Sequence, residues 1–358
     1  MPVQNISVEQ LWELAGLYPV LDVRSPAEYN HAHIPGAYSL PLFSDEERKL
    51  IGTTYKQESR EKAIKYGLDF FGVKMRKMVE EAEKIYKAHL KTTTGRTSVQ
   101  ETKTLVVHCW RGGMRSAAVA WLLGFYGFEV YLLEGGYKVF RNWVLSQFEK
   151  KYNFTILGGY TGSGKTEVLH SLRQSAIPVI DLEGMASHKG SSFGALGQPP
   201  QPSQEMFENM LAIALYENSG HAFWLEDESQ RIGVLNIPHA FWKSMRTKSV
   251  LFLDIPFEQR LQHVMAGYGS LEKELLVNAI IRIKQRLGPL ETKTAIGYLV
   301  EDNIMESFRI LLQYYDKTYQ KALEKRENFS ALINRVASNV VDPEINTKKI
   351  ILCKPVNA

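Results

Sequence analysis

Cys109 lies in a sequence context that favours a reactive thiol. The segment LVVHCWRGGMRSAAVAWLL (105–123) places it after an apolar run typical of a strand and before an apolar run typical of a helix. Glycines at 112 and 113 allow the backbone N–H groups of the intervening loop to converge on an anion. Arg111, Arg115 and the positive end of the helix should lower the pKa of the thiol. We therefore predict that Cys109 is a nucleophile, with Arg115 and Arg111 as its catalytic partners.

A second set of residues has the spacing of a phosphate-binding loop. ILGGYTGSGKTEVL (156–169) contains Gly-x4-Gly-Lys-Thr between an apolar run and a helical pattern, which is the context that this motif requires. Backbone N–H groups of 162–166 can wrap a diphosphate, and the lysine adds a positive charge. The predicted phosphate-binding residues are Gly159, Gly162, Ser163, Gly164, Lys165 and Thr166. Because a hydroxyl at the last position can bind a metal, we expect Mg²⁺ through Thr166.

Acidic residues at the ends of three apolar segments are candidates for the metal side of that phosphate site. FWLEDES (223–229) contains Glu226, Asp227 and Glu228 after its apolar run, LFLDIP (251–256) offers another carboxylate, and Asp181 offers a third. The sequence does not choose between the first two segments, and a capping role suits Asp181. Glu226 and Asp227 are predicted as possible metal-side residues, with a solvated strand end as the alternative.

Basic residues concentrate in one part of the chain. Residues 48–103 contain 14 Lys or Arg and 7 Asp or Glu, a surplus of +7, whereas the formal net charge of the whole chain is +4. Such a surplus can attract a polyanion, and Lys74, Arg76 and Lys77 are the candidate contacts. The alternative is a solvated helical face, which is how most charge runs behave.

Two successive alternations of strand and helix position these residues. In the first, strands are expected at 19–25, 104–109 and 130–136, a helix at 115–127, and a charged helical segment over 44–91. In the second, the phosphate-binding strand, loop and helix (154–174) are followed by strand candidates at 177–184, 221–229 and 249–256 and by mostly helical sequence to about 327. Alternation of this kind predicts parallel sheets with right-handed crossovers.

The pattern predicts two α/β domains. The first covers 1–145 with a charged helical insertion at about 44–103, and the second covers 146–358 with a helical C-terminal extension. One long loop, SHKGSSFGALGQPPQPSQ (187–204), interrupts the second domain. Loops of that length are usually functional or disordered.

Composition narrows the class of protein. Hydrophobic residues at 44% and charged residues at 23% are ordinary for a globular chain, and two cysteines are too few for a disulfide framework. No apolar run approaches the roughly 20 residues of a membrane-spanning helix. The N-terminal MPVQNISVEQLWEL lacks the pattern of a secretory signal. We expect a soluble protein of the cytoplasm that does not associate with membranes.

Two families share the motif around Cys109. HCWRGGMRS fits the Cys-x5-Arg-Ser signature of cysteine-dependent phosphatases and also resembles the active loop of rhodanese sulfurtransferases. Upstream, LDVRSPAEYNHAHIPGAYSLPL (21–42) resembles the rhodanese N-terminal motif. The two segments together favour a rhodanese domain for residues 7–140.

Five blocks of sequence together resemble the tRNA 2-selenouridine synthase family. The blocks are CWRGGMRS, LEGGYKVFRNWV, GGYTGSGKTEVL, SHKGSSFGALGQ and EDESQRIG, and the resemblance covers about 7–330. It implies an N-terminal rhodanese-like parallel-sheet domain, followed by a P-loop NTPase-like α/β domain with a helical C-terminal part.

The resemblance also implies a function. Members of this family replace the sulfur of 2-thiouridine at the wobble position (34) of tRNA with selenium from selenophosphate, through S-geranyl-2-thiouridine made from geranyl diphosphate. By that resemblance the P-loop holds the diphosphate of geranyl diphosphate with Mg²⁺, and the Cys109 loop holds selenophosphate. No tightly bound organic cofactor is expected. The implied partners are the tRNA anticodon stem-loop and an enzyme that supplies selenophosphate, and the oligomeric state stays open.

Other functions remain open on the residues alone. The main alternative is a rhodanese-type sulfurtransferase coupled to a nucleotide-hydrolysing P-loop domain. A phosphatase–kinase fusion and a non-catalytic RNA-binding protein are the others.

Overall fold

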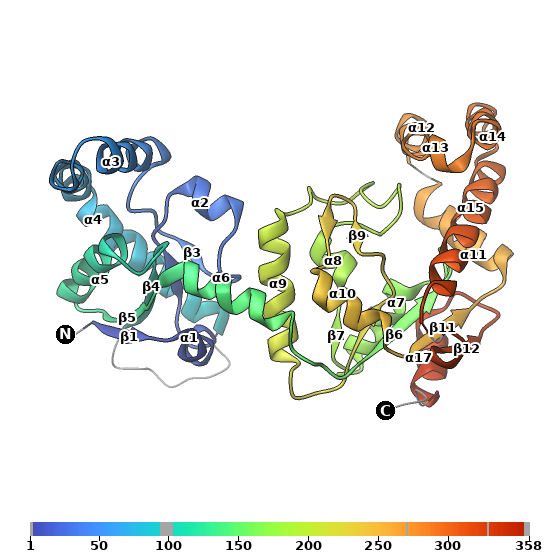
Figure 1. Ribbon diagram of the computed structural model, residues 1–358, viewed down its shortest axis with the longest axis horizontal. Coiled ribbons are helices and arrows are strands. Elements are labelled where there is room, and N and C mark those ends of the chain that lie inside the picture. The colour runs from blue at the N-terminus through green and yellow to red at the C-terminus, as the bar shows by residue number, and fades with distance from the viewer. Residues whose placement is uncertain (1–2, 94–102, 270, 328, 354–358) are drawn as a thin grey trace. The chain divides into compact units, whose positions relative to one another are not determined.

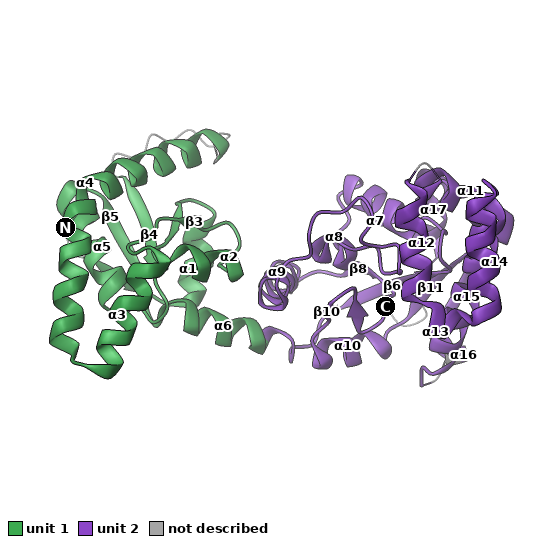
Figure 2. Cartoon of the chain, turned by 90° about the horizontal axis from the view of Figure 1, so that it is seen from above, with its two compact units in different colours: residues 1–146 green, residues 147–358 purple. Residues whose placement is uncertain are grey.

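Two compact units, Met1–Ser146 and Gln147–Ala358, make up the chain in the computed structural model, which describes residues 3–93, 103–269, 271–327 and 329–353 (Figure 2). Each unit contains one five-stranded parallel sheet with helices packed against it (Figure 1). The α/β class and the parallel sheets predicted from the sequence are therefore confirmed.

The first unit is built around the strand that leads to Cys109. Its strands are β1 Gln4–Ile6, β2 Val20–Asp22, β3 Tyr38–Ser39, β4 Thr104–His108 and β5 Glu129–Leu133, in the order β1-β5-β4-β2-β3. Its helices are α1 Val8–Ala15, α2 Pro26–His31, α3 Asp45–Gln57, α4 Arg60–Thr93, α5 Met114–Tyr126 and α6 Gly136–Gln147. Since β2 pairs with β4 in a register that sets Asp22 beside His108, the segments that follow both strands emerge at one edge of the sheet.

The second unit is built around the strand that leads to the P-loop. Its strands are β6 Phe154–Gly159, β7 Val179–Ile180, β8 Phe223–Glu226, β9 Arg231–Ile232, β10 Leu235–Asn236, β11 Val250–Asp254 and β12 Ile333–Ala337. The sheet has the order β12-β11-β6-β8-β7, and β9 and β10 form a separate antiparallel pair. Because β6 lies between β11 and β8, both of the acidic segments considered as metal-side candidates end beside the P-loop strand.

Helices complete the second unit in two groups. Flanking the sheet or following its strands are α7 Lys165–Gln174, α8 Leu182–Ala186, α9 Gln204–Glu217, α10 His239–Arg246, α16 Phe329–Leu332 and α17 Pro343–Leu352. The C-terminal helical part contains α11 Phe257–Tyr268, α12 Lys273–Arg282, α13 Lys284–Leu287, α14 Pro289–Val300 and α15 Ile304–Glu324. These helices enclose an apolar core of their own, into which Phe193 from the long loop inserts.

Some element boundaries differ from the sequence-based expectations. The strand expected at 177–184 ends at Ile180, because the Asp181 carboxylate accepts a hydrogen bond from the Gly184 N–H and caps α8. The edge strand β12 and the β9–β10 pair were not expected. The charged segment 44–91 forms two helices, α3 and α4, and most of the polar loop expected at 91–103 lies outside the described residues.

Candidate functional site

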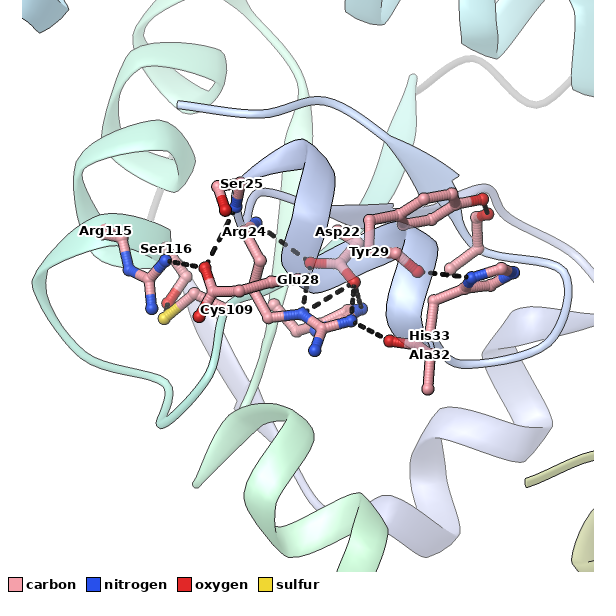
Figure 3. Close-up of polar contacts among 12 residues, drawn as sticks. Asp22, Arg24, Ser25, Glu28, Tyr29, Ala32, His33, Cys109, Arg115 and Ser116 are labelled. Atoms are coloured by element: carbon pink, nitrogen blue, oxygen red, sulfur yellow. Dashed lines mark hydrogen bonds and ion pairs between the residues drawn. The ribbon is translucent and has the colours of Figure 1, made fainter. Parts of the chain in front are cut away.

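The Cys109 thiol lies at the point where β4 gives way to the loop before α5. It is buried, and its Sγ lies 3.1 Å from the Ser116 Oγ on the first turns of α5 (Figure 3). The Ser116 hydroxyl is also 3.1 Å from the carbonyl oxygen of Gly113. A hydroxyl has one proton to donate, so a neutral thiol donates to Ser116, whereas a thiolate would accept from it.

Close approach of two glycine pairs shapes this loop. Gly112 and Gly136 both have left-handed backbones, with φ of 62° and 59°. A methyl group on Gly136 would lie 2.3 Å from the Cys109 carbonyl oxygen, and one on Gly112 would lie 2.9 Å from the Gly135 nitrogen. The carbonyl of Cys109 in turn accepts a 2.8 Å hydrogen bond from the Tyr137 N–H. The backbone of residues 133–137 (LEGGY) therefore packs against the Cys109 loop and holds it in place. Only glycine fits where the backbones of these two segments come into contact.

Several contacts favour the thiolate of Cys109. Burial raises the pKa of this thiol, but its hydrogen bond with Ser116 and the backbone N–H of Arg111 act in the opposite direction. The positive charge of Arg115 also lowers it. The lowering contributions prevail, and the thiol is more acidic than an ordinary cysteine.

Arg115 and Arg111, the two predicted partners of Cys109, have different surroundings. The Arg115 Nη1 donates a 2.8 Å hydrogen bond to the Glu28 Oε2, and this pairing lowers the pKa of Glu28 although burial acts to raise it. Glu28 also accepts a hydrogen bond from the Ser25 N–H (Figure 3). Arg111 is exposed, and its side chain has no ion pair among the residues that the structure describes. Arg115 is thus held in place, while Arg111 is free to contact an anion.

A buried ion pair supports the loop from β2. The Arg24 guanidinium donates to both carboxylate oxygens of Asp22, with an Nη2–Oδ2 distance of 2.6 Å, and to the Ala32 carbonyl. It also lies over the Tyr137 ring, 3.8 Å from the centroid. Since Tyr137 is hydrogen-bonded to Cys109 through the backbone, the Asp22–Arg24 pair ties the upstream motif to the cysteine loop.

The predicted phosphate-binding residues form a loop between β6 and α7. Gly159, Gly162 and Gly164 all have positive φ, and Gly164 caps the N-terminus of α7. The Lys165 Nζ donates a 2.8 Å hydrogen bond to the Gly159 carbonyl across the loop. The Ser163 hydroxyl is buried beneath the loop and has no hydrogen-bond partner among the described residues. The arrangement has the backbone conformation of an anion-binding loop, with the lysine beside it.

Helices α11 and α15 brace the P-loop from outside. The Arg260 Nη1 of α11 donates to the Thr161 carbonyl at 3.0 Å. The same guanidinium forms a bidentate ion pair with Asp316 of α15, with hydrogen bonds of 2.9 and 2.7 Å. A methyl group on Gly162 would lie 2.8 Å from the Arg260 carbonyl oxygen. The loop is therefore held in shape by protein contacts before any ligand binds.

Thr166 faces a carboxylate that the sequence did not single out. Its hydroxyl donates a 3.0 Å hydrogen bond to the Glu183 Oε2 on α8. Glu226 accepts from the Glu183 N–H at 2.7 Å, and Glu228 is hydrogen-bonded to Glu183 through the side chains. Burial, together with the neighbouring carboxylates, raises the pKa of Glu226 to about 8 and also raises those of Glu183 and Glu228.

The other acidic candidates are engaged elsewhere. Asp227 accepts hydrogen bonds from the buried Arg326 and from the Tyr319 hydroxyl, the latter at 2.8 Å. Asp254, at the end of β11, pairs with Arg335 at 3.0 Å. The end of β8 is therefore linked to Thr166 only indirectly, because Glu226 contacts the backbone of Glu183, whose carboxylate accepts from the Thr166 hydroxyl.

Mg²⁺ fits this site only together with a phosphate ligand. The hydroxyl of Thr166 and the carboxylate of Glu183 are oxygen groups of the kind that Mg²⁺ prefers. Among the described residues, no group of three or more His, Cys, Asp or Glu side chains could hold a metal ion. Ligand phosphate oxygens and water would have to complete the coordination.

The three predicted polyanion contacts on α4 are not equivalent. Lys74 is half-buried and pairs with Glu47 of α3, so it joins the two helices. Arg76 pairs with Glu80 but its side chain is 92% exposed, and Lys77 is exposed. Of these three residues, Arg76 and Lys77 are the two that are exposed enough to contact a large partner.

Sequence reasoning assigned no role to three side chains that contact the predicted site residues: Glu28, Ser116 and Glu183. Ser116 was visible as the last residue of the Cys-x5-Arg-Ser signature, and Glu28 lies in the upstream motif. For Glu183 the spacing gives no signal, because its contacts depend on the order of the strands in the sheet. Glu228 was considered only as part of the acidic strand end with Glu226 and Asp227. No helix among the described residues is long and apolar enough to cross a membrane.

Comparison with known proteins gives a consistent result for the two units. Residues 7–142 match the model of the rhodanese-like domain, and residues 152–342 match the model of the tRNA 2-selenouridine synthase AAA domain. Three proteins named tRNA 2-selenouridine synthase are similar over most of their length. The one from Shewanella piezotolerans is 32% identical, covering 91% of this chain and 94% of the relative. The one from Bdellovibrio bacteriovorus is 33% identical with the same coverage, and the one from Nitrosomonas europaea is 34% identical, covering 81% and 73%.

Proposed function

The chain belongs to the tRNA 2-selenouridine synthase family of enzymes, and we propose that it converts wobble 2-thiouridine to 2-selenouridine in two chemical steps, one for each unit. The observation that carries this proposal is the presence of two anion-binding loops with different chemistry. One holds a cysteine whose pKa is lowered, and the other holds a lysine and a threonine but no thiol.

The first step is S-geranylation at the P-loop. The thiocarbonyl sulfur of the nucleoside attacks C1 of geranyl diphosphate, the carbon–oxygen bond breaks, and the ring N3 loses its proton. The leaving group is diphosphate, an anion that the loop N–H groups and Lys165 can stabilise as it departs. Mg²⁺ would neutralise further charge on the diphosphate, and Thr166 and Glu183 are the residues that would hold it.

The second step is exchange at the Cys109 loop. The selenium of selenophosphate attacks C2 of the S-geranyl nucleoside and expels geranyl thiol, and water then cleaves the Se–P bond and releases phosphate. In the unmodified nucleoside, the sulfur of the thiocarbonyl would have to leave as sulfide, which is a poor leaving group. Selenophosphate is a tetrahedral anion that suits the loop N–H groups and the exposed Arg111. The Cys109 thiol serves this step by positioning the selenium donor.

We further propose that the tRNA anticodon stem-loop binds through its phosphates to basic residues that include Arg76 and Lys77. Such an enzyme would act in the cytoplasm, where it would receive selenophosphate from the enzyme that makes it.

Incubation of the purified protein with 2-thiouridine tRNA tests this function. Geranyl diphosphate alone should give the S-geranyl nucleoside, and added selenophosphate should convert it to 2-selenouridine, both detected by mass spectrometry of digested tRNA. Hydrolysis of ATP or GTP should stay negligible. Robust nucleotide hydrolysis stimulated by tRNA, without geranyl transfer, would favour a sulfurtransferase coupled to a nucleotide-driven domain instead.

A further inference from the structure

The first part of the long loop, residues 187–194, contacts the carboxylate that faces the P-loop. Its Gly190 has a left-handed backbone, with φ of 65°. A methyl group on Gly190 would lie 2.8 Å from the Glu183 Oε1 and 2.9 Å from the Glu228 Oε1. The other carboxylate oxygen of Glu183, Oε2, accepts the hydrogen bond from Thr166. A single carboxylate therefore separates the backbone of this loop from the Thr166 hydroxyl.

Thr166 identifies which side of the P-loop this is. In a P-loop the hydroxyl at this position faces the phosphates and their metal ion, and the lysine before it reaches the same phosphates. Lys165 acts on the same carboxylate, because burial raises the pKa of Glu183 and the positive charge of Lys165 opposes that rise. The long loop therefore borders the side of the P-loop at which phosphate binds.

Lys189, directly before Gly190, adds a positive charge at this side. Its side chain is exposed, and its Nζ lies 5.7 Å from the centroid of the Tyr268 ring on α11. The hydrogen bond from His263 lowers the pKa of Glu167, in the first turn of α7, to about 2, and the charge of Lys189 contributes to this shift. The ammonium group is therefore near enough to the N-terminus of α7 to act on a charge there.

Tyr268 places the same ammonium group from a second direction. Burial raises the pKa of Tyr268 to about 12, and the negative charges of Glu183 and Glu167 add to that rise. The ring beside Lys189 thus lies within electrostatic reach of both the partner of Thr166 and the first turn of α7. Within the described ranges Lys189 forms no ion pair, so no carboxylate of the protein neutralises it directly.

The backbone that carries Lys189 is fixed by its surroundings. The Lys189 N–H donates a 3.0 Å hydrogen bond to the Gly194 carbonyl, which closes a tight turn. The Ser192 N–H donates to the Tyr315 hydroxyl on α15 at 3.2 Å, and Phe193 is buried in the core of the C-terminal helices. The lysine is therefore held beside the P-loop before any ligand binds, which reduces the entropy that binding must cost.

A departing diphosphate needs more positive charge than one lysine supplies. When the bond between C1 and oxygen breaks, its electron pair stays on the leaving oxygen, so negative charge on the diphosphate increases. Positive groups already in place around that oxygen stabilise the transition state without having to reorganise.

We propose that Lys189 is a second cationic group of the phosphate site, which contacts the diphosphate of the prenyl ester together with Lys165 and stabilises it as it leaves. The inference rests on the proposed function and adds to it a residue of the long loop, to which that function assigns no role. Lys189 donates hydrogen bonds and keeps its proton, so the bonds made and broken are those of the geranyl transfer alone.

Lysine labelling of the full-length protein tests this assignment without any substitution. Acetylation by an N-hydroxysuccinimide ester would be followed at each lysine by mass spectrometry, with and without inorganic diphosphate and Mg²⁺. With diphosphate at about ten times its Kd, labelling of Lys189 should slow about tenfold, because only the ligand-free fraction reacts. Lys243 is the matched control and should be unaffected. It is also exposed, and it lies on α10, which ends just before β11 begins and so at the opposite edge of the sheet from the P-loop.

Calorimetric titration of variants measures what the charge contributes. Lys189→Gln should weaken the binding of inorganic diphosphate and of geranyl diphosphate by about tenfold or more, as expected for the loss of one charge-assisted hydrogen bond. Lys189→Arg keeps the charge and should recover most of the affinity, whereas Lys243→Gln should bind like wild type. Melting temperatures would establish that each variant is folded.

Unchanged labelling of Lys189, or wild-type affinity in folded Lys189→Gln protein, would overturn the assignment. So would equal losses of affinity in Lys189→Gln and Lys189→Arg, which would show that the residue supports the loop and does not act through its charge.

Failure of the proposed function gives a different pattern. If the unaltered protein does not transfer geranyl groups to tRNA, but diphosphate protects Lys189 and Lys189→Gln weakens its binding, Lys189 belongs to the phosphate site and only the prenyl substrate is wrong. If geranyl transfer occurs and Lys189→Gln binds like wild type, only the role of Lys189 is wrong. If the unaltered protein does not bind diphosphate, the proposed function and this inference both fall.

Discussion

At the scale of single residues, a neighbouring hydroxyl is the largest of the contacts that lower the pKa of the Cys109 thiol. Ser116 is buried with Cys109, and it is the only hydrogen-bond partner of the sulfur that comes from a side chain within the described residues. The positive charge of Arg115 also lowers the pKa of the thiol, but Arg115 is paired with Glu28, whose negative charge offsets part of this effect. The serine is therefore the residue whose removal should alter the thiol most directly without changing the loop backbone.

Ser116→Ala should raise the pKa of the Cys109 thiol. A hydrogen bond worth about 1 kcal/mol corresponds to roughly 0.7 pKa unit. Because the reactive thiolate is lost as pH falls through the pKa, the variant should lose reactivity at a higher pH than the wild type. The rate of alkylation by iodoacetamide across pH 5.5–9.5 measures the midpoint, with Cys353→Ser as the background so that only one thiol reacts. An unchanged midpoint would mean that backbone N–H groups and arginine charge alone set the acidity.

At the scale of elements, the meeting of two glycine-containing turns sets the geometry of the cysteine loop. The left-handed backbone of Gly136 and its contact with the Cys109 carbonyl leave no room for a side chain. The sequence displayed both turns, but it could not show that they touch. That contact follows from β4 and β5 being neighbours in the sheet.

Gly136→Ala should displace the Cys109 loop. The cost should be a few kcal/mol, because a left-handed alanine and a 2.3 Å contact with backbone oppose the native conformation together. Gly36→Ala is a matched control, since Gly36 also has positive φ (84°) but nothing lies within 4 Å of its added methyl group. Thermal unfolding and cysteine alkylation together check this. Equal effects of the two substitutions would show that strain, and not the contact, is responsible.

The charged helices allow a test of where tRNA binds. Arg76→Gln and Lys77→Gln should each weaken tRNA binding and lower the slope of log affinity against log salt by up to about one, because each removes one phosphate contact. Lys74→Gln should leave the slope unchanged and reduce stability instead, since Lys74 joins α4 to Glu47 of α3. Filter binding from 50 to 300 mM salt gives the slopes. If all three variants keep the wild-type slope, tRNA binds on another surface.

The sequence identified the strands that carry both loops because long apolar runs and glycine motifs are local signals. Strands β4, β6 and β11 and helices α5 and α7 were expected close to where they lie. The short edge strand β12 was missed because polar residues interrupt it and its stability comes from pairing with β11. The same limit applies to the carboxylates. Glu183 reaches Thr166 only because β8 and β7 follow β6 in the sheet, an order that no local pattern encodes.

At the scale of the whole molecule, we propose that each unit carries out one of the two half-reactions. Each unit has its own parallel sheet and its own glycine-containing loop, which we propose binds an anion. In the proposed function the loop that contains Lys165 stabilises a departing diphosphate, and this loop contains no thiol. The loop that contains Cys109 has a thiol and a nearby free arginine, which suits the donor of selenium. Loss of the key residue of each loop should therefore stop the sequence at a different step.

Mass spectrometry of nucleosides from tRNA treated with the variants Lys165→Ala and Cys109→Ser tests this claim most directly. The tRNA would first be incubated with geranyl diphosphate, and selenophosphate would then be added. Lys165→Ala should form neither product, because diphosphate departure loses its positive charge. Cys109→Ser should accumulate the S-geranyl nucleoside and form no 2-selenouridine, since a serine hydroxyl is neutral near pH 7. Loss of both products in folded Cys109→Ser protein would contradict the account and place both steps in one composite site.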